Sequence, residues 1–319
     1  MNKVALLCFG LGLASKKDYS AKERLLGFLA LVPPIFWFLT PINAASAVAL
    51  SLDGYPSWDK AIIGLLTVAL AGWGVNALNH YLDRERDKVI WPARTLPTGR
   101  VKPHIALIST VVAFICALLL SWFFFNPVNF LFLLIAIILG ALYSAYLRDR
   151  VGYLSLPPIV GLVSLGGWAA FAPETLLTSW LPWFLYFLHC CWQAGHIMVY
   201  YPLHVTNDAT GKRSLKTPPA LFGVPSPKTA VSIGIGFACL TLVLSIVLPL
   251  LAPLSYLYLA LVSVTGIYGL VMGVRFFRDI ENTKKGLQSF TALSVFRLVT
   301  VGAILLDVFV AHLYYWGKN

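Results

Sequence analysis

The chain has 319 residues, of which 59% are hydrophobic and 12% charged, whereas soluble domains are about 45–50% apolar and about 25% charged. This composition excludes a disordered chain, which needs low hydrophobicity, and a soluble enzyme, because one core cannot hide so much apolar surface. The 24 Lys and Arg outnumber the 13 Asp and Glu, but nucleic-acid binding would need a solvated basic face with stacking aromatics. The sequence therefore predicts a polytopic membrane protein with no nucleic-acid partner.

The N-terminal residues 1–24 are expected to form a cytoplasmic segment ahead of a transmembrane domain over 25–316. Met1–Ser15 is similar to a signal peptide, but it lacks a small-residue cleavage site, and Lys16-Lys17 favours a retained interfacial segment. A bilayer core about 30 Å thick needs about 20 apolar residues per helix. Nine apolar runs of this kind predict nine transmembrane helices, at about 25–50, 59–82, 103–124, 128–147, 153–172, 178–201, 229–251, 254–274 and 288–315.

The positions of the cations test this topology independently. Of the 24 Lys and Arg, 21 fall in the N-terminal segment or in the loops after the second, fourth, sixth and eighth predicted helices. Lys60 and Lys318 fall on the opposite side, and Arg297 lies inside the last helix. Because cytoplasmic loops carry the excess of Lys and Arg, we expect the N-terminus and these loops in the cytoplasm and the C-terminus outside.

Polar residues crowd at two of the predicted helix ends, and the first group closes the second helix. Asn79, Asp83 and Asp87 are spaced four residues apart, which places them on one helical stripe. Carboxylate and amide oxygens suit Mg²⁺, a hard cation that also keeps waters and substrate phosphates. The alternative interpretation is a solvated helix end with ion pairs along the helix, because three cations are interleaved with these residues.

The second group follows the sixth predicted helix. It combines an imidazole, an amide, a carboxylate and three cations: His204, Asn207, Asp208, Lys212, Arg213 and Lys216. Two such helix ends on one membrane face suit a polyanion bridged by a divalent metal. Diphosphate is the obvious polyanion, and a membrane enzyme would meet it on an isoprenoid.

With these residues in place, the sequence resembles the UbiA superfamily of intramembrane prenyltransferases, whose members have nine helices and two Asp-rich motifs. The family motif N-D-x-x-D-x-x-x-D is matched at Asn79, Asp83 and Asp87, with His80 in place of its second-position Asp. The family stretch R-P-L-P-S-G-R reads Arg94-Thr95-Leu96-Pro97-Thr98-Gly99-Arg100 here, and Tyr143-Ser144 before Arg148 resembles the family's Tyr-Ser and basic pair.

The second family motif, D-x-x-x-D followed by G and K-T-x-P, is matched with two departures. It reads His204-x-x-x-Asp208, then Gly211 and Lys216-Thr217-Pro218. His204 replaces the first Asp, and imidazole suits zinc or transition metals better than Mg²⁺; the spacing from Asp208 to Lys216 is also about two residues longer than in the family. A second Mg²⁺ would be held by Asp208 alone, by Asn207 with Asp208, or not at all, and we expect His204 to donate to diphosphate instead.

The resemblance implies an all-α bundle of nine transmembrane helices around a central cavity. It also implies Mg²⁺-assisted ionisation of a prenyl diphosphate and capture of the carbocation by an aromatic or other lipophilic acceptor. By this resemblance Asp83, Asp87 and Asp208 are catalytic, and with Asn79 they hold the metal. The residues expected to bind diphosphate are Asn76, Arg94, Arg100, Tyr143, Arg148, His204, Lys212 and Lys216.

Several interior residues allow a structural or a functional interpretation. His189 and His196 share one helix face and either touch the acceptor or, as we favour, hydrogen-bond across helices. Arg297 must face the interior or the near interface, in a structural ion pair or in a site, and Asp307 is expected to be structural. Aromatic residues either pack or wall the carbocation by cation–π attraction; the candidates are Trp73, Tyr81, Trp168, Phe187, Trp192, Tyr200 and Tyr201.

Two other functions stay open at this point. An intramembrane terpene cyclase of the same superfamily would ionise the diphosphate and capture the cation within its own chain, without an acceptor. A transporter, or a non-catalytic membrane partner, would keep the fold alone. Transporters tend to have inverted repeats and broken helices at the membrane midplane, whereas the polar groups here gather at one membrane face. The sequence leaves the acceptor, the prenyl length and the oligomeric state undetermined.

Overall fold

A computed structural model describes residues 19–32, 34–204, 206–207, 213–214 and 226–316. The described chain is helical apart from one antiparallel pairing of β1 (Thr206–Asn207) with β2 (Arg213–Ser214). The helices are α2 (Ala21–Leu29), α3 (Pro34–Leu52), α4 (Trp58–Leu82), α5 (Arg84–Ile90), α6 (Pro103–Phe124), α7 (Pro127–Leu142), α8 (Arg148–Arg150), α9 (Pro157–Phe171), α10 (Leu181–Tyr200), α11 (Pro227–Val247), α12 (Tyr256–Arg278) and α13 (Thr283–Trp316).

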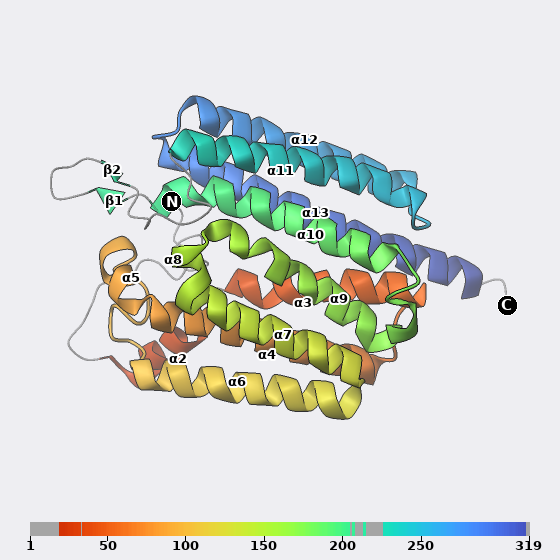
Figure 1. Ribbon diagram of the computed structural model, residues 1–319, viewed down its shortest axis with the longest axis horizontal. Helices are drawn as coiled ribbons and strands as arrows, with labels where there is room; N and C mark the ends of the chain where they lie inside the picture. The colour runs from red at the N-terminus through yellow and green to blue at the C-terminus, as the bar shows by residue number, and fades with distance from the viewer. Residues whose placement is uncertain (1–18, 33, 205, 208–212, 215–225, 317–319) are drawn as a thin grey trace.

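Seven helical segments of the described chain are long and apolar enough to cross a membrane. They are Trp58–Leu82, Pro103–Phe124, Pro127–Arg150, Tyr153–Phe171, Pro227–Leu250, Tyr256–Arg278 and Thr283–Ala311, with Thr40–Leu52 as a shorter apolar helix. Helix α10 runs alongside them in Figure 1, but two histidines and Gln193 lower its hydropathy. The prediction of a multi-pass helical membrane protein is confirmed, and the exact number of nine spans stays a prediction.

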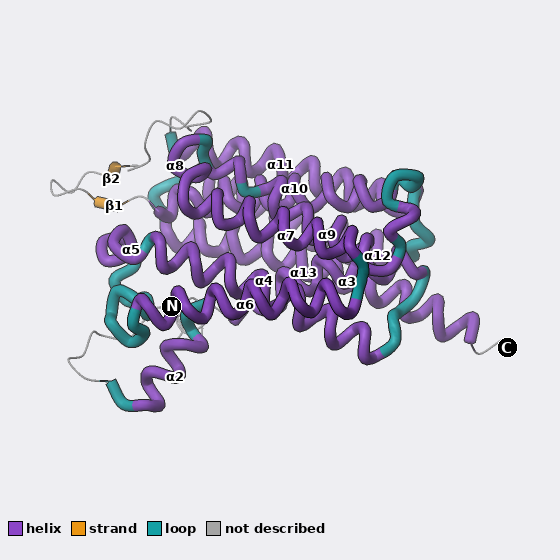
Figure 2. The backbone as a smooth tube through the Cα atoms, turned by 60° about the horizontal axis from the view of Figure 1, so that its bottom comes forward, coloured by secondary structure: helices purple, strands orange, loops and turns teal. Residues whose placement is uncertain are grey.

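The long helices run roughly parallel and form one bundle (Figures 1 and 2). Helix α3 packs against helices that lie far apart in the sequence, namely α4, α9 and α13. Helices α2, α5 and α8 lie at the same end of the bundle, at the left of Figure 1, and the C-terminus lies at the other end. The end with α5 and α8 is called the charged end below.

The helices begin where the sequence supplies start signals. Proline stands in the first turn of α6, α7, α9 and α11, where its missing N–H costs nothing. Asn126 accepts hydrogen bonds from the backbone N–H groups of Val128 and Asn129 at the start of α7, and Ser226 accepts one from Thr229 at the start of α11. These caps satisfy N–H groups that a helix leaves unpaired at its N-terminus.

The first predicted helix, at about 25–50, is wrong as one continuous element. The chain forms α2 and α3 instead, and α3 begins at Pro34. Proline lacks the N–H that a continuing helix would need and restricts the residue before it. Helix α2 starts at residue 21 with a capping box, in which Ser20 and Glu23 bond reciprocally.

Small residues let the central helices approach closely. A side chain at Gly167 on α9 would meet the backbone oxygen of Ala44 on α3 at 2.8 Å, and one at Gly195 on α10 would meet the backbone of Gly234 on α11 at 3.1 Å. Close packing of this kind replaces the hydrophobic effect as the force between helices inside a membrane. These close approaches join α3 to α9 and α10 to α11.

Candidate active site

The first motif spans the junction between α4 and α5 at the charged end. Asn79 lies in the last turn of α4, Asp83 stands between the two helices, and Asp87 lies in α5. The backbone N–H of Asp83 donates to the oxygen of Asn79 at 2.9 Å, and that of Asp87 donates to the oxygen of Asp83 at 2.8 Å. The helical hydrogen-bond pattern therefore passes through the junction, although the structure divides the predicted single stripe between two helices.

Asp83 forms a bidentate ion pair with Arg148. Nη1 of Arg148 donates to Oδ2 at 2.5 Å and Nη2 donates to Oδ1 at 2.6 Å, with the two side chains 8% and 12% exposed. Arg148 follows a π-helical turn at Tyr143–Leu147, and such turns in a helix often occur at functional sites. The structure thus brings a predicted metal ligand and a predicted diphosphate ligand into direct contact.

A second carboxylate, Asp149, supports this pair, although no motif in the sequence marks it as a site residue. Asp149 accepts from Arg86 Nη2 at 3.0 and 3.1 Å and from Arg148 Nε at 3.3 Å. Nη1 of Arg86 also lies 3.8 Å from Asp83. Asp149 stands between two arginines in the sequence, which was the available signal, but its partner Arg86 is 63 residues away.

Asp87 forms the corresponding pair with Arg94. Nη1 of Arg94 donates to both carboxylate oxygens at 2.8 Å, and Nδ1 of His80 lies 3.9 Å from Oδ2. Asp87 is 3% exposed. Burial raises the pKa of its carboxyl, and the neighbouring Arg94 charge opposes that rise. His80, which stands where the family has an Asp, therefore lies beside a motif carboxylate.

Arg100 lies in the same loop but does not join these pairs. Its Nε donates to Thr98 Oγ1 and its Nη2 donates to the oxygen of Ala93, both at 3.2 Å. Gly99 has a φ of 75°, a left-handed conformation that glycine adopts without strain. Burial lowers the pKa of the Arg100 guanidinium. Arg100 therefore shapes the loop between α5 and α6.

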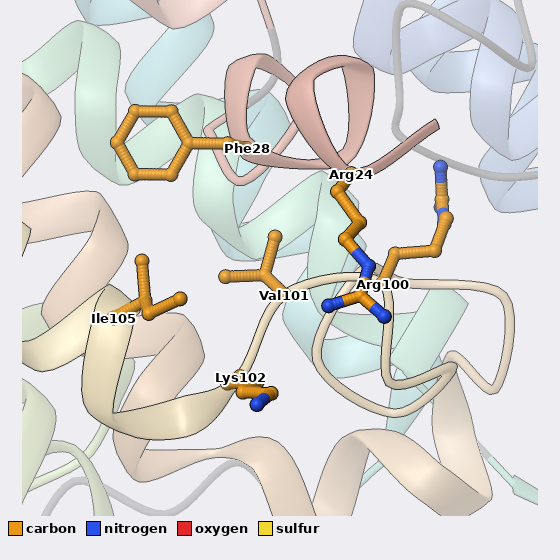
Figure 3. A pocket seen from close by; sticks show the side chains of 6 residues that line it. All are labelled: Arg24, Phe28, Arg100, Val101, Lys102 and Ile105. Atoms are coloured by element: carbon orange, nitrogen blue, oxygen red, sulfur yellow. The ribbon is translucent and has the colours of Figure 1, made fainter. Parts of the chain in front are cut away.

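A pocket of about 160 Å³ opens beside Arg100 (Figure 3). Arg24, Phe28 and Lys102 also line it, so that two exposed cations stand next to apolar side chains from α2 and α6. Cations with apolar stems are usual near a membrane interface, where the charged head reaches water. None of the residues that line this pocket belongs to the ion pairs of the first motif.

The other predicted residues of the described chain lie close to the pairs. The amide nitrogen of Asn79 donates to Ser144 Oγ at 3.4 Å, next to the buried Tyr143. Asn76 uses its amide nitrogen for the backbone oxygen of Gly72 at 2.8 Å. The oxygen of the Asn79 amide therefore remains usable as a metal ligand, whereas Asn76 is bound to its own helix through its nitrogen.

The second motif is only partly described. Tyr201–His204 forms a 3₁₀ turn directly after α10, and Tyr201 packs edge-on against Tyr153 at 5.1 Å between ring centroids. This turn places the backbone of His204 at the end of α10. The His204 side chain and the predicted residues Asp208, Lys212 and Lys216 lie outside the described residues.

The donor set of the first motif fits Mg²⁺. It offers two carboxylates and an amide oxygen, and a magnesium site typically uses one or two carboxylates together with waters and substrate phosphates. Within the described part of the chain, no three His, Cys, Asp or Glu side chains form a closed metal site.

The interior residues mostly follow their structural interpretation. His196 Nε2 pairs with Ser294 Oγ on α13 at 3.1 Å, and His189 Nδ1 pairs with Ser164 Oγ on α9, so the predicted cross-helix hydrogen bonds are present. Asp307 accepts from the backbone N–H and the hydroxyl of Ser255 at the start of α12, which is the structural role predicted for it.

The fold and the paired Asp and Arg side chains at one bundle end define a multi-pass membrane protein of the prenyltransferase type. The family model described as "UbiA prenyltransferase family" matches residues 25–306, so the chain belongs to this family.

Curated relatives carry transferase names. The chain is 28% identical over 244 residues to digeranylgeranylglyceryl phosphate synthase of Thermococcus kodakarensis, covering 75% of this chain and 83% of the relative. It is 33% identical over 142 residues to protoheme IX farnesyltransferase of Hyperthermus butylicus, covering 40% of this chain and 46% of the relative.

Solved structures share the fold. A UbiA homolog from Aeropyrum pernix K1 matches with a TM-score of 0.68 at 17% identity, covering 84% of this chain and 97% of that chain. A UbiA homolog from Archaeoglobus fulgidus bound to DMAPP and Mg²⁺ matches with a TM-score of 0.55 at 19% identity, covering 86% and 99%.

Proposed function

We propose that the chain transfers a prenyl group from a prenyl diphosphate to a lipophilic acceptor within the membrane. The observation that carries this proposal is the pairing of Asp83 with Arg148 and of Asp87 with Arg94 at one bundle end. Two carboxylates for a divalent cation and two arginines for phosphate oxygens thus stand within one cluster. The alternative interpretation expects solvent-exposed ion pairs, whereas the Arg148 and Asp87 side chains are only 8% and 4% exposed in theirs.

In the proposed reaction the C1–O bond of the prenyl diphosphate breaks and its electron pair goes to the diphosphate oxygen. The resulting allylic cation takes an electron pair from the acceptor, which forms the new bond and then loses a proton. Arg148 and Arg94 would turn from their carboxylates to the developing negative charge, where planar guanidinium groups bind phosphate oxygens in pairs. Asp83 and Asp87 would hold Mg²⁺, which would supply Lewis-acid charge for the leaving group.

The second motif, which begins directly after α10, would complete this cluster. We propose Asp208 as a further metal ligand, with His204, Lys212 and Lys216 on the diphosphate side; the resemblance of residues 204–218 to the second family motif supports this. We propose that three further residues contact the diphosphate at the edge of this cluster: Arg100, Tyr143 and Asn76. Arg100 and Asn76 also donate hydrogen bonds to backbone oxygens. Tyr200 and Phe290, whose rings pack together, would exclude water from the allylic carbocation.

We further propose that the charged end faces the cytoplasm. The loop after α5, the segment around α8 and the start of α11 carry cations, and the excess of Lys and Arg favours the cytoplasmic side. This orientation would give the site access to prenyl diphosphates made in water. The acceptor would reach it through the lipid.

Purified protein in lipid nanodiscs tests the function. Prenyl diphosphates of several chain lengths are supplied with Mg²⁺, with and without a mixture of membrane lipophiles, and diphosphate release and products are measured by mass spectrometry. We expect release only with an acceptor, and a product equal to acceptor plus prenyl group minus a proton. Release without acceptor, together with a cyclic hydrocarbon, would establish the cyclase alternative that the altered second motif keeps open. Absence of both release and prenyl diphosphate binding would refute either enzyme.

A further inference from the structure

Arg297 is a buried cation inside the bundle, on the membrane-spanning part of α13. It is 2% exposed, its Nε donates to Asn43 Oδ1 on α3 at 2.9 Å, and its guanidinium lies 5.0 Å from the centre of the Trp192 ring. Its Nη2 is buried without a hydrogen-bond partner. Among the described residues no Asp or Glu forms an ion pair with it.

A second orphaned polar atom lies on the helix that faces Arg297. His189 is fully buried on α10, three residues before Trp192 and therefore on the same helix face. Its Nδ1 pairs with Ser164 Oγ, but its Nε2 has no partner. When Ser164 donates to Nδ1, Nε2 carries the proton and becomes a second unused donor.

These two atoms are costly unless something binds to them. A charged side chain in the membrane interior is rare and expensive, and it normally pairs or faces a functional pathway. A buried donor that makes no hydrogen bond costs the full desolvation of that group. Asn43 offers one neutral oxygen and cannot balance the charge. The group that would satisfy both atoms is an oxyanion, which accepts several hydrogen bonds and carries the missing negative charge.

An aromatic row connects this position with the charged end. Along α10, Trp192 stacks on His196 at 4.7 Å between centroids; on α13, Phe290 lies 4.2 Å from His196 and 4.8 Å from Tyr200. Tyr200 is the last residue of α10, directly before the 3₁₀ turn at Tyr201–His204 where the second motif begins. At 1.5 Å per residue, Trp192 lies about 12 Å along α10 from Tyr200. Arg297 is thus about two helical turns below the cluster proposed to bind diphosphate.

We propose that Arg297, with His189, binds an oxyanion of the acceptor, a carboxylate or a phosphate, and so positions the acceptor beneath the prenyl diphosphate. This inference rests on the proposed transferase function and narrows its substrate class to lipophiles that carry a negative charge. The guanidinium fork fits both oxyanions.

The test measures acceptor binding separately from turnover. Three matched pairs are titrated into the nanodisc protein: geranylgeranylglyceryl phosphate against geranylgeranylglycerol, protoheme IX against its dimethyl ester, and 4-hydroxybenzoate against its methyl ester. The variants are R297Q, R297K and H189Q. The matched control is T300A, because Thr300 is buried on the same helix but bonds only to its own helix at Phe296.

We expect the wild-type protein to prefer the anionic member of at least one pair by about 10- to 100-fold, the range of hydrogen bonds to charged groups. R297Q should abolish that preference, H189Q should reduce it, R297K should keep part of it, and T300A should leave it intact. The proposal is wrong if the wild type prefers no anionic member, or if R297Q retains the preference. If R297Q does not fold, an unchanged preference in both R297K and H189Q overturns it.

The transferase function and the acceptor site can be disproved separately. If the protein neither binds nor ionises prenyl diphosphate, the proposed transferase function fails whatever the acceptor pairs show. If prenyl transfer proceeds but the acceptor affinity is indifferent to charge and to Arg297, only the acceptor site fails.

Discussion

Arg148 binds Asp83 through two hydrogen bonds of 2.5 and 2.6 Å, across 65 residues of sequence. Arg94 binds Asp87 in the same cluster through two contacts of 2.8 Å. Each carboxylate proposed for the metal is therefore paired with an arginine proposed for the diphosphate. We expect the binding of metal and diphosphate to separate both pairs, so that Mg²⁺ and substrate each favour the binding of the other.

Replacing Arg148 should consequently change the two affinities in opposite directions. In R148Q, Asp83 loses its competing cation, so the affinity for Mg²⁺ alone should rise several-fold; the affinity for prenyl diphosphate should fall by about 10- to 100-fold. Calorimetry on the nanodisc protein measures both. R150Q is the control, because Arg150 is exposed and lies over the ring of Tyr146. A parallel fall of both affinities in R148Q would show that the pair only maintains the fold.

Asp83 and Arg84 are adjacent in sequence and should differ sharply in function. D83N removes a charge that a metal site cannot replace, so prenyl transfer should fall by at least about 100-fold while the protein stays folded. R84A should cost less than about threefold, because Arg84 bonds to the oxygen of Tyr81 and stacks over its ring at a half-exposed position. Activity is measured by diphosphate release, and folding by gel filtration and circular dichroism. Similar losses in both variants would contradict a metal site.

Much of this architecture could be predicted from the sequence because a bilayer restricts the possibilities. A membrane crossing requires a long apolar run, and the predicted ranges lie close to the observed helices, as for 103–124 and α6 (Pro103–Phe124). The break between α2 and α3 was missed because apolar composition continues across it, although Pro34 marked it. A continuous apolar run does not by itself show where one helix ends and the next begins.

The site was predictable in its members but not in their contacts. The spacing of Asn79, Asp83 and Asp87 indicated one helical stripe. The family resemblance indicated that Arg94 and Arg148 bind diphosphate. Their pairing with the carboxylates depends on the π turn after α7 and on the loop after α5, which are tertiary features without a sequence period. The same holds for Asp149, whose role appears only when α8 meets Arg86.

The topology can be tested by cysteine labelling. In a cysteine-free background, cysteines replacing Arg86 and Lys228 should react with impermeant reagents from the same side of the membrane, and a cysteine replacing Lys60 from the other side. The reason is that α4 and the start of α11 place Arg86 and Lys228 at the charged end, while Lys60 begins α4 at the opposite end. Labelling in intact cells and in inverted vesicles assigns the sides. Reaction of positions 86 and 228 from different sides would disprove the orientation.

Asp307 should affect stability without affecting chemistry. It caps the start of α12 through Ser255 and is 9% exposed. D307A should lower the free energy of unfolding by about 1–3 kcal/mol, the cost of leaving buried donors unpaired, and should leave the KM for prenyl diphosphate unchanged. Thermal unfolding in detergent and steady-state kinetics measure the two effects. L306A at the neighbouring exposed position is the control, and a raised KM in D307A would place this residue in the site.

His204 offers the sharpest test of the second motif, where the family has an Asp. If it donates to diphosphate and does not bind the metal, H204A should weaken prenyl diphosphate binding more than Mg²⁺ binding, by about tenfold for one lost hydrogen bond to a charged group. H204D should restore a carboxylate for the metal, so we expect a steeper Mg²⁺ dependence with activity kept or improved. The protonated imidazole offers two donors and a charge, whereas the neutral ring offers one donor. Both affinities are measured by calorimetry and turnover by diphosphate release. If H204D is inactive while H204A behaves like the wild type, His204 takes no part, and the metal site must rest on Asp208 and the first motif.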